Sequence, residues 1–234
     1  MPNLPLTETR RPKRQIRSFV RREGRITPAQ RKALAELWPR YGIEDNDALL
    51  DWALLFGPGT PITVEIGFGD GQCLRQLANA NVDLAYIGIE SHRSGTGRLL
   101  MSLQQDALTN VKVLIGDAVD ILNTRIASQS VDEFLIFFPD PWPKKRHHKR
   151  RLVNADFLSS LARCLKPNGL IHIATDWDDY AKVIVDLIRT ESLLHNLSEQ
   201  GISPRPASRP ETKYERRGVR LGHQVYDIIA RRRL

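Results

Sequence analysis

The 234-residue sequence predicts an α/β fold built on a mostly parallel, doubly wound, Rossmann-like sheet. From residue 60 onward, apolar segments of strand length alternate with segments of helical length. The apolar segments are nearly continuous, which is typical of parallel strands buried on both faces. Because crossovers between parallel strands are right-handed, we expect the intervening helices to cover both faces of the sheet.

The chain divides into three predicted parts. They are a basic arm without stable structure of its own at residues 1–27, N-terminal helices at 28–59, and the main domain at 60–234. A first helix is predicted to begin with Thr27 as N-cap and Pro28 at its first position, and to end at Pro39. A second short helix is predicted over 47–56, followed by a Gly-Pro-Gly break at 57–59.

The main domain repeats a strand and a helix five times. The predicted strands are 62–67, 84–90, 111–116, 132–138 and 170–176, and the predicted helices are 71–80, 94–108, 119–126, 154–165 and 178–190. The Pro-Asn-Gly stretch at 167–169 predicts a turn. A last strand is predicted over 225–232.

The net charge of +8 is concentrated at the N-terminus. Residues 1–32 contain ten Lys/Arg and two Glu, whereas the rest of the chain is balanced apart from a basic cluster at 144–151. A basic arm together with a basic cluster indicates a polyanionic partner, with nucleic acid ahead of a membrane. For the arm alone, a solubilising tail is an equally good interpretation.

Composition argues against several other classes of protein. No apolar run approaches about 18 residues, so we expect no membrane-spanning helix. The polar N-terminus has no apolar segment typical of a secretory signal, although its Arg-rich start also fits a mitochondrial presequence. Cys73 and Cys164 lack zinc-ligand spacing, so we expect buried free thiols, no metal site and a reducing cytoplasm. The sequence does not distinguish a monomer from a homodimer.

Ligands of open α/β sheets bind at the carboxyl ends of the strands, and an acidic residue follows four of the predicted strands here. The first stretch is EIGFGDG, with Glu65 followed by Gly67, Gly69 and Gly71. Its G-x-G-x-G spacing differs from the G-x-G-x-x-G of dinucleotide sites. The Glu disfavours a diphosphate and suits a ligand with an ammonium or sulfonium group. A tight strand–helix turn is the structural alternative.

Two further acids suggest an adenosine cofactor. Glu90 ends the second strand, where an acid commonly bridges ribose hydroxyls. Asp117 follows the third strand and suits either the exocyclic amine of adenine or the N-cap of the next helix. Together with Glu65, these acids predict S-adenosylmethionine and not NAD.

Asp140 follows the fourth strand, where a methyl acceptor would meet the cofactor. Pro139 and Pro141 restrict the backbone on both sides of it. Trp142 is suited equally to stacking on a base or to packing, and the P-D-P-W order differs from the D-P-P-W of adenine-N6 methyltransferases.

The six basic residues that follow are Lys144, Lys145, Arg146, Lys149, Arg150 and Arg151. They would neutralise several phosphates. Each neutralised phosphate contributes roughly −0.7 to −0.9 to the slope of the logarithm of the binding constant against the logarithm of the salt concentration. His147 and His148 have no third ligand in range, which disfavours a metal site.

These residues resemble the bacterial tRNA (guanine-N7)-methyltransferases over nearly the whole chain. The matching stretches are RSFVRREGR (17–25), EIGFGDG (65–71), GIESHRSGTG (88–97), GDA (116–118), FFPDPWPKKRHHKRR (137–151), ATDW (174–177) and RPASRPETKYERRGVRLGH (205–223). The resemblance implies a class I, S-adenosylmethionine-dependent methyltransferase fold. It also implies methylation of N7 of a guanine in the variable loop of tRNA. Asp70 departs from the family pattern, which tolerates apolar residues there.

The resemblance also implies roles for individual residues. Cofactor contacts are implied at Glu65, Glu90, Asp117 and Asp140, with Asp140 as the catalytic residue. Substrate contacts are implied at Lys144, Asp176, Thr212, Lys213, Tyr214 and Glu215. RNA contacts are implied at Arg146, His147, His148, Lys149, Arg150 and Arg151.

The predicted chemistry is a direct in-line displacement, because guanine N7 has a free lone pair. The purine gains a positive charge, which a carboxylate of Asp140, Asp176 or Glu215 would stabilise. Two other classes compete with this interpretation. A non-catalytic RNA-binding protein is disfavoured by the complete set of strand-end acids. An NAD-dependent oxidoreductase is disfavoured by the glycine spacing and by the absence of a typical catalytic Lys, Tyr-x-x-x-Lys or His–Asp arrangement.

Overall fold

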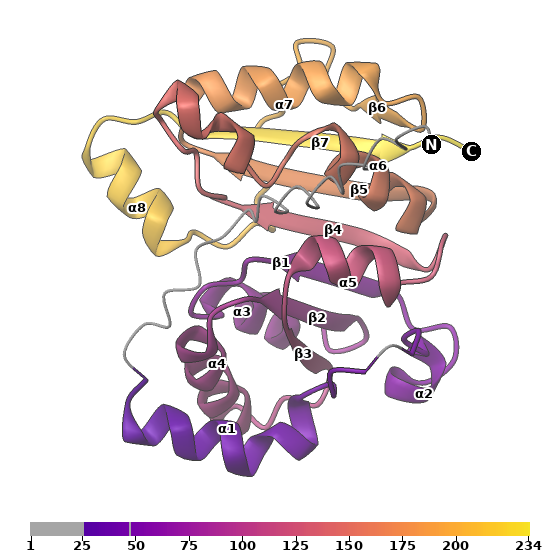
Figure 1. Ribbon diagram of the computed structural model, residues 1–234, viewed down its shortest axis with the longest axis vertical. Helices are drawn as coiled ribbons and strands as arrows, with labels where there is room; N and C mark the ends of the chain where they lie inside the picture. The colour runs from indigo at the N-terminus through magenta and orange to yellow at the C-terminus, as the bar shows by residue number, and fades with distance from the viewer. Residues whose placement is uncertain (1–25, 47) are drawn as a thin grey trace, which may run out of the picture.

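A computed structural model describes residues 26–46 and 48–234. These residues form one seven-stranded sheet with the order β3-β2-β1-β4-β5-β7-β6 (Figure 1). The strands are β1 (Ile62–Ile66), β2 (Ala85–Glu90), β3 (Val111–Ile115), β4 (Val131–Phe137), β5 (Leu165–Thr175), β6 (Leu194–Asn196) and β7 (Tyr226–Arg232). The pairs among β1 to β5 are parallel, and β7 runs antiparallel to both of its neighbours. The predicted mostly parallel, doubly wound sheet is therefore confirmed.

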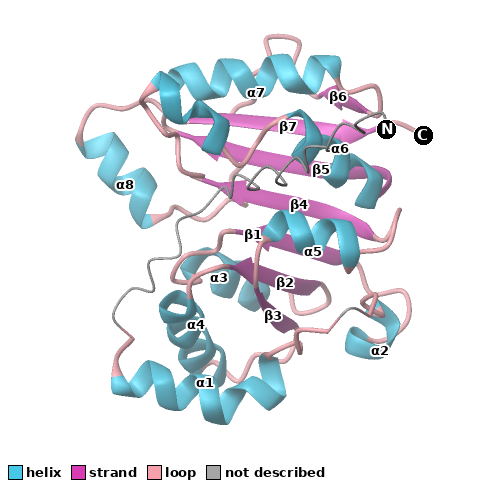
Figure 2. Cartoon of the chain, in the orientation of Figure 1, coloured by secondary structure: helices cyan, strands magenta, loops and turns pink. Residues whose placement is uncertain are grey.

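Helices cover both faces of this sheet (Figure 2). Side chains of α5 (Ala118–Thr124), α6 (Ala155–Cys164) and α7 (Asp178–Thr190) share one apolar core with the strands. On the other face, α1 (Pro28–Tyr41), α3 (Gln72–Ala80) and α4 (Arg93–Gln105) pack over the β1–β3 half. The remaining helical segments are α2 (Trp52–Phe56), the 3₁₀ helix η1 (Lys145–Arg150) and α8 (Lys213–Arg220).

The second face of the β4–β5–β7 half is covered differently. Phe137, Ala174 and Cys73 form a small apolar cluster there. Beside it, buried His172 and Asp227 are in contact at 2.7 Å, so the strands present polar side chains on this face. Arg209, from the segment before α8, pairs with Asp227 at 2.8 Å, so this segment contacts the same face of the sheet.

The start of α1 is as predicted, but its end is not. Thr27 caps the helix, and Pro28 stands at its start. The helix runs past Pro39 to Tyr41. A proline so close to a C-terminus removes a single backbone hydrogen bond, and the 1 % exposed Tyr41 anchors the last turn in the core.

Other boundaries also differ from the predictions. Helix α2 starts only at Trp52, capped by Asp51, and residue 47 lies outside the described residues. The predicted turn at 167–169 is an irregular part of the long strand β5, with Asn168 at a φ of 65° and a register shift in the β4 pairing. The short strand β6 and helix α8 were not predicted. The arm at residues 1–25 also lies outside the described residues.

Candidate active site

A cleft of about 720 Å³ opens at the carboxyl edge of the parallel strands. The loops after β1, β2 and β4 form its walls, and residues at the start of α1, α4 and α8 complete them. Among the predicted site residues, the cleft is lined by Gly67, Gly69, Glu90, Asp140, Lys213 and Tyr214. The sheet topology thus brings together residues that are up to 147 positions apart in the sequence (67 to 214).

The three glycines after β1 serve two different purposes. Gly67 and Gly69 have φ of 75° and 61°, and a Cβ at either position would meet no atom within 4 Å. Gly71 also has a positive φ, but a Cβ there would lie 2.6 Å from a methyl carbon of Leu99. The first two glycines therefore leave open space beside the cleft, whereas the third permits α3 and α4 to approach each other.

Glu65 lies in β1 directly before this loop, with its side chain almost completely buried. Its Oε2 atom has no hydrogen-bond partner. Burial, and then the negative charges of Glu90 and Asp70, raise the pKa of Glu65 to about 8. The Cys73 thiol contacts this carboxyl, and its own pKa is raised by burial and then by Glu65. Glu65 itself does not line the cleft, although the loop that directly follows β1 does, and a buried unpaired carboxyl oxygen is a potential partner for a polar or cationic group.

Glu90 lines the cleft beside the glycine loop. Its Oε2 accepts a hydrogen bond from the Gly69 amide at 2.9 Å, and its Oε1 accepts from the amides of Ser91 and His92 at 2.7 and 3.0 Å. The carboxylate is consequently fixed while it lines the cleft. Glu90 therefore also holds the glycine loop in place, which the sequence did not indicate.

Asp117 caps α5, and its side chain accepts a hydrogen bond from the Val119 amide at 3.0 Å. Its neighbours Gly116 and Ala118 line the cleft. Asp117 is therefore the N-cap of α5, which is one of the two roles predicted for it from the sequence. Its cofactor contact stays a prediction.

Asp140 stands on an exposed loop between two residues with unusual backbone angles. Phe138 and Trp142 have φ of 54° and 45°, which is rare for non-glycine residues and concentrates at functional sites. Asp140 lines the cleft, and none of the described residues hydrogen-bonds its carboxylate. The Trp142 ring lines the cleft and also packs, with the His147 ring at 5.8 Å and the Arg150 guanidinium at 5.1 Å. The prolines are therefore only part of what shapes this loop.

The basic residues after this loop form the 3₁₀ helix η1. Lys144, Arg146 and Lys149 are exposed, as expected for phosphate contacts. His147 and His148 are half-buried. Burial, and then the positive charges of neighbouring residues, lower the pKa of His147. Arg151 differs from all of them because its side chain is only 4 % exposed. Contacts of this segment with RNA stay a prediction.

The four predicted substrate residues at 212–215 belong to the first turn of α8. Thr212 is the N-cap, and it forms a capping box with Glu215. Lys213 and Tyr214 line the cleft. Lys213 Nζ lies 2.8 Å from Asp70 Oδ2 on the glycine loop, so α8 is joined to the opposite side of the cleft. Burial would raise the pKa of Asp70, but its hydrogen bond with Lys213 and the charge of Lys213 outweigh burial and lower it.

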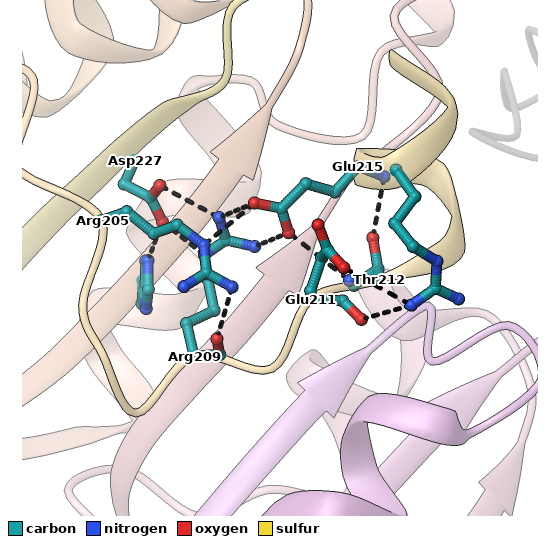
Figure 3. Close-up of polar contacts among 8 residues, drawn as sticks. Arg205, Arg209, Glu211, Thr212, Glu215 and Asp227 are labelled. Atoms are coloured by element: carbon teal, nitrogen blue, oxygen red, sulfur yellow. Dashed lines mark hydrogen bonds and ion pairs between the residues drawn. The ribbon is translucent and has the colours of Figure 1, made fainter. Parts of the chain in front are cut away.

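Glu215 does not line the cleft, and its buried side chain is part of an ion network (Figure 3). Its two oxygens pair with the Arg209 guanidinium at 2.7 Å each, and Arg205 Nε lies 2.9 Å from Oε1. Arg209 Nε also lies 2.8 Å from Asp227, which in turn contacts His172. The network joins the first turn of α8 to strands β5 and β7. Removing one partner of such a buried pair typically costs about 3–5 kcal/mol of stability.

Asp176 follows β5 and contacts α8 on the other side. Its Oδ2 lies 3.2 Å from His223 Nδ1. A Cβ at Gly218 would come within 2.8 Å of the same oxygen, so the close approach of α8 requires glycine there. Asp176 and Glu215 therefore both position α8, and their contacts with a base stay a prediction.

Sequence reasoning missed several residues that shape this site. Ser91, His92 and Arg98 line the cleft, and Arg209 holds α8. A local signal was available for α8, since the T-x-x-E spacing of Thr212 and Glu215 is a capping box. No local signal exists for Arg209, because its partners are assembled only by the fold. Among the described residues, no group of three or more His, Cys, Asp or Glu could hold a metal ion, and no helix is long and apolar enough to cross a membrane.

The chain has the Rossmann-like α/β fold that several solved methyltransferases share. A crystal structure of an rRNA methylase from Streptococcus thermophilus has a TM-score of 0.52 with 10% sequence identity, covering 75% of this chain and 88% of that one. A precorrin-6y C5,15-methyltransferase from Geobacter metallireducens has a TM-score of 0.51 with 12% identity, covering 88% and 87%. At such low identities the similarity concerns the fold alone.

The sequence places the chain more closely. A family described as "Putative methyltransferase" matches residues 59–228. The tRNA (guanine-N(7)-)-methyltransferase of Alcanivorax borkumensis is 45% identical over 97% of this chain and 95% of that protein. The enzyme of the same name from Nitrosospira multiformis is 47% identical over 95% and 96%. The chain belongs to the tRNA (guanine-N(7)-)-methyltransferase family, as its resemblance implied.

Proposed function

We propose that this protein transfers a methyl group from S-adenosylmethionine to N7 of a guanine in the variable loop of tRNA. The observation that carries the proposal is the shared cleft, in which the glycine loop and Glu90 face the same space as Asp140 and Tyr214. The names of the relatives support tRNA as the substrate and guanine N7 as the acceptor. A reducing cytoplasm suits both tRNA and the buried free thiols.

The residues beneath and around the cleft fit this cofactor. Gly67 and Gly69 leave room for close approach of a ligand to the backbone. Glu65 supplies an unpaired buried oxygen for a positive group, and Glu90 supplies a fixed carboxylate for ribose hydroxyls. S-adenosylmethionine provides an electrophilic methyl group on a sulfonium centre. A diphosphate-containing cofactor fits poorly, because Asp70 and Glu90, which both line the cleft, would repel it.

Asp140 is proposed to act on the acceptor base. N7 of guanine attacks with its own lone pair, so the protein need not remove a proton first. The purine ring gains a positive charge as N7 forms its new bond. The Asp140 carboxylate, held on a rigid loop, stabilises that charge and accepts hydrogen bonds from the base. Tyr214 and Trp142, which line the same cleft, provide aromatic surfaces on which the base can stack.

Positive residues are proposed to hold the tRNA beside this cleft. Lys144, Arg146 and Lys149 are exposed next to the Asp140 loop. The arm at 1–25 adds eight basic residues and two acidic ones. These cations would bind the phosphate backbone and the shape of the folded tRNA, while the cleft receives a single exposed guanine.

The direct test combines purified protein, tRNA and methyl-labelled S-adenosylmethionine. We expect label in tRNA, located at N7 of a variable-loop guanine by chemical cleavage at the modified base. In thermal unfolding, S-adenosylmethionine at about 100 times its dissociation constant should add about 2.7 kcal/mol, whereas NAD should add nothing. Label at another base position, or stabilisation by NAD alone, would refute the proposal.

A further inference from the structure

Arg151 ends the basic run, yet its surroundings differ from those of a phosphate contact. Its side chain is 4 % exposed, whereas Lys149, two residues earlier, is exposed. A phosphate bound by Arg151 would have to displace protein groups that already surround the guanidinium. The family resemblance groups it with the RNA-contacting residues, but the geometry indicates a different task.

The Arg151 guanidinium contacts four protein groups. Its Nε donates to the Pro141 carbonyl oxygen at 2.8 Å, and its Nη2 donates to Asp179 Oδ2 at 2.7 Å. Nη2 also lies 3.3 Å from His148 Nε2, and the guanidinium stacks 4.6 Å from the centre of the Tyr180 ring. Tyr180 is fully buried in α7. Arg151 therefore joins the backbone of the Asp140 loop to a rigid helix.

The Asp140 loop needs such an anchor. Phe138 and Trp142 stand in the left-handed region, which costs of order 1–3 kcal/mol for each non-glycine residue. At one end, the Phe138 amide donates to the Ala174 carbonyl oxygen of β5 at 2.7 Å. At the other end, Pro141 is held by Arg151. Asp140 lies between these two anchors, and neither flanking proline has an N–H with which to form another.

We propose that Arg151 is a positioning residue that fixes the Asp140 carboxylate in the cleft, and that it is not a phosphate ligand. The inference rests on the proposed function, since it assigns Arg151 to the methyl-transfer step. The planar guanidinium is required because it donates in two directions while its face rests on Tyr180. An ammonium group keeps the charge but cannot reproduce both hydrogen bonds and the stacking.

The decisive variant is Arg151→Lys, which preserves the positive charge. We expect the single-turnover rate of methyl transfer to fall by about 10²-fold, as for a misplacement of about 1 Å. The tRNA dissociation constant and its salt dependence should stay at the wild-type values. Lys149→Gln should show the opposite pattern, with weaker tRNA binding and a salt slope reduced by about one log unit per decade.

Asp179→Ala is the second variant, at a partner that is 59 % exposed and can be removed without disturbing the core. Asp179→Ala should also lower the single-turnover rate, but by less than Arg151→Lys does. Asp186→Ala, which removes an exposed acid from the same helix, is the matched control and should keep the wild-type rate. If Arg151→Lys does not fold, the result for Asp179→Ala decides.

A wild-type rate in Arg151→Lys, or in Asp179→Ala where that variant decides, would overturn the inference. A weakened, less salt-dependent tRNA complex with Arg151→Lys would also overturn it, because that result identifies a phosphate contact. The wild-type protein is assayed in parallel. If it fails to methylate guanine N7, the proposed function is wrong. If it succeeds while Arg151→Lys matches it, only the positioning role is wrong.

Discussion

At the scale of single residues, the negative charge of Asp140 can be separated from its ability to accept hydrogen bonds. Asp140→Asn keeps an oxygen acceptor but removes the charge. Because the base becomes positive during the reaction, we expect turnover to fall by about 10²–10³. Asp140→Ala should fall by a similar amount. The measurement is single-turnover methyl transfer with saturating S-adenosylmethionine and tRNA.

Both Asp140 variants should fold and bind tRNA normally, which circular dichroism and a binding titration check. Asp140 is exposed, so its replacement leaves the core packing unchanged. If Asp140→Asn keeps activity within a few-fold of the wild type, the charge is not needed. Asp140 would then act by positioning alone.

The raised pKa of the buried Glu65 carboxyl should make the stability of the ligand-free protein depend on pH. Burial, and then Glu90 and Asp70, raise its pKa from 4.5 to about 8 in the folded state. Between these values the folded state binds more protons than the unfolded state, so stability falls as pH rises, by about 1.4 kcal/mol per pH unit. Glu65→Gln removes this dependence. The unfolding free energy of Glu65→Gln, relative to that of the wild type, should therefore increase from about pH 5 to about pH 8.

Chemical denaturation across this pH range measures the effect. Glu199→Gln, at an exposed carboxyl, controls for replacing a Glu with Gln anywhere in the chain. A constant difference between Glu65→Gln and wild type at all pH values would show that Glu65 is already ionised in the folded state.

At the scale of elements, α8 and the glycine loop are joined by the Asp70–Lys213 ion pair, with the two side chains 22 % and 43 % exposed. Asp70→Asn should weaken this connection between α8 and the glycine loop. For a partly exposed pair worth about 0.3–1 kcal/mol, S-adenosylmethionine binding should weaken by about two- to fivefold. The difference should shrink at high salt, which screens the pair in the wild type.

A double-mutant cycle with Lys213→Met tests whether the pair itself is responsible. In the Lys213→Met background, Asp70→Asn should have little further effect on S-adenosylmethionine binding. Full additivity of the two changes would show that each residue acts independently and that α8 is not held by this ion pair.

The same element shows where prediction from sequence ends. Parallel strands all end at one edge of the sheet, so the positions of Glu90 and Asp140 in a single cleft followed from the strand pattern alone. The ion pair between Asp70 and Lys213 joins residues 143 positions apart and depends on where the C-terminal segment crosses the sheet. Likewise, Arg151 looks like one more basic residue in the sequence, and only packing against Tyr180 distinguishes it.

At the scale of the whole molecule, most of the net charge lies in the first 25 residues of the sequence. Residues 1–25 carry eight basic and two acidic residues, which is +6 of the total of +8. The described chain begins beside the cleft, since Thr27 and Gln30 line it. The arm is therefore attached at the site where the tRNA would bind. This attachment favours phosphate binding over a solubilising tail for the arm.

Deleting residues 1–25 should leave the fold and S-adenosylmethionine binding intact, because α1 starts with its own capping box at Thr27 and Gln30. Binding of tRNA should weaken, and the salt slope should decrease by about one log unit per decade for each phosphate that the arm no longer neutralises. A full-length variant with the eight basic residues changed to Gln separates charge from chain length, and its salt slope should decrease by the same amount. An unchanged slope in both proteins would assign tRNA binding to the folded domain, because a phosphate-binding arm that loses its eight basic residues has to release fewer counterions.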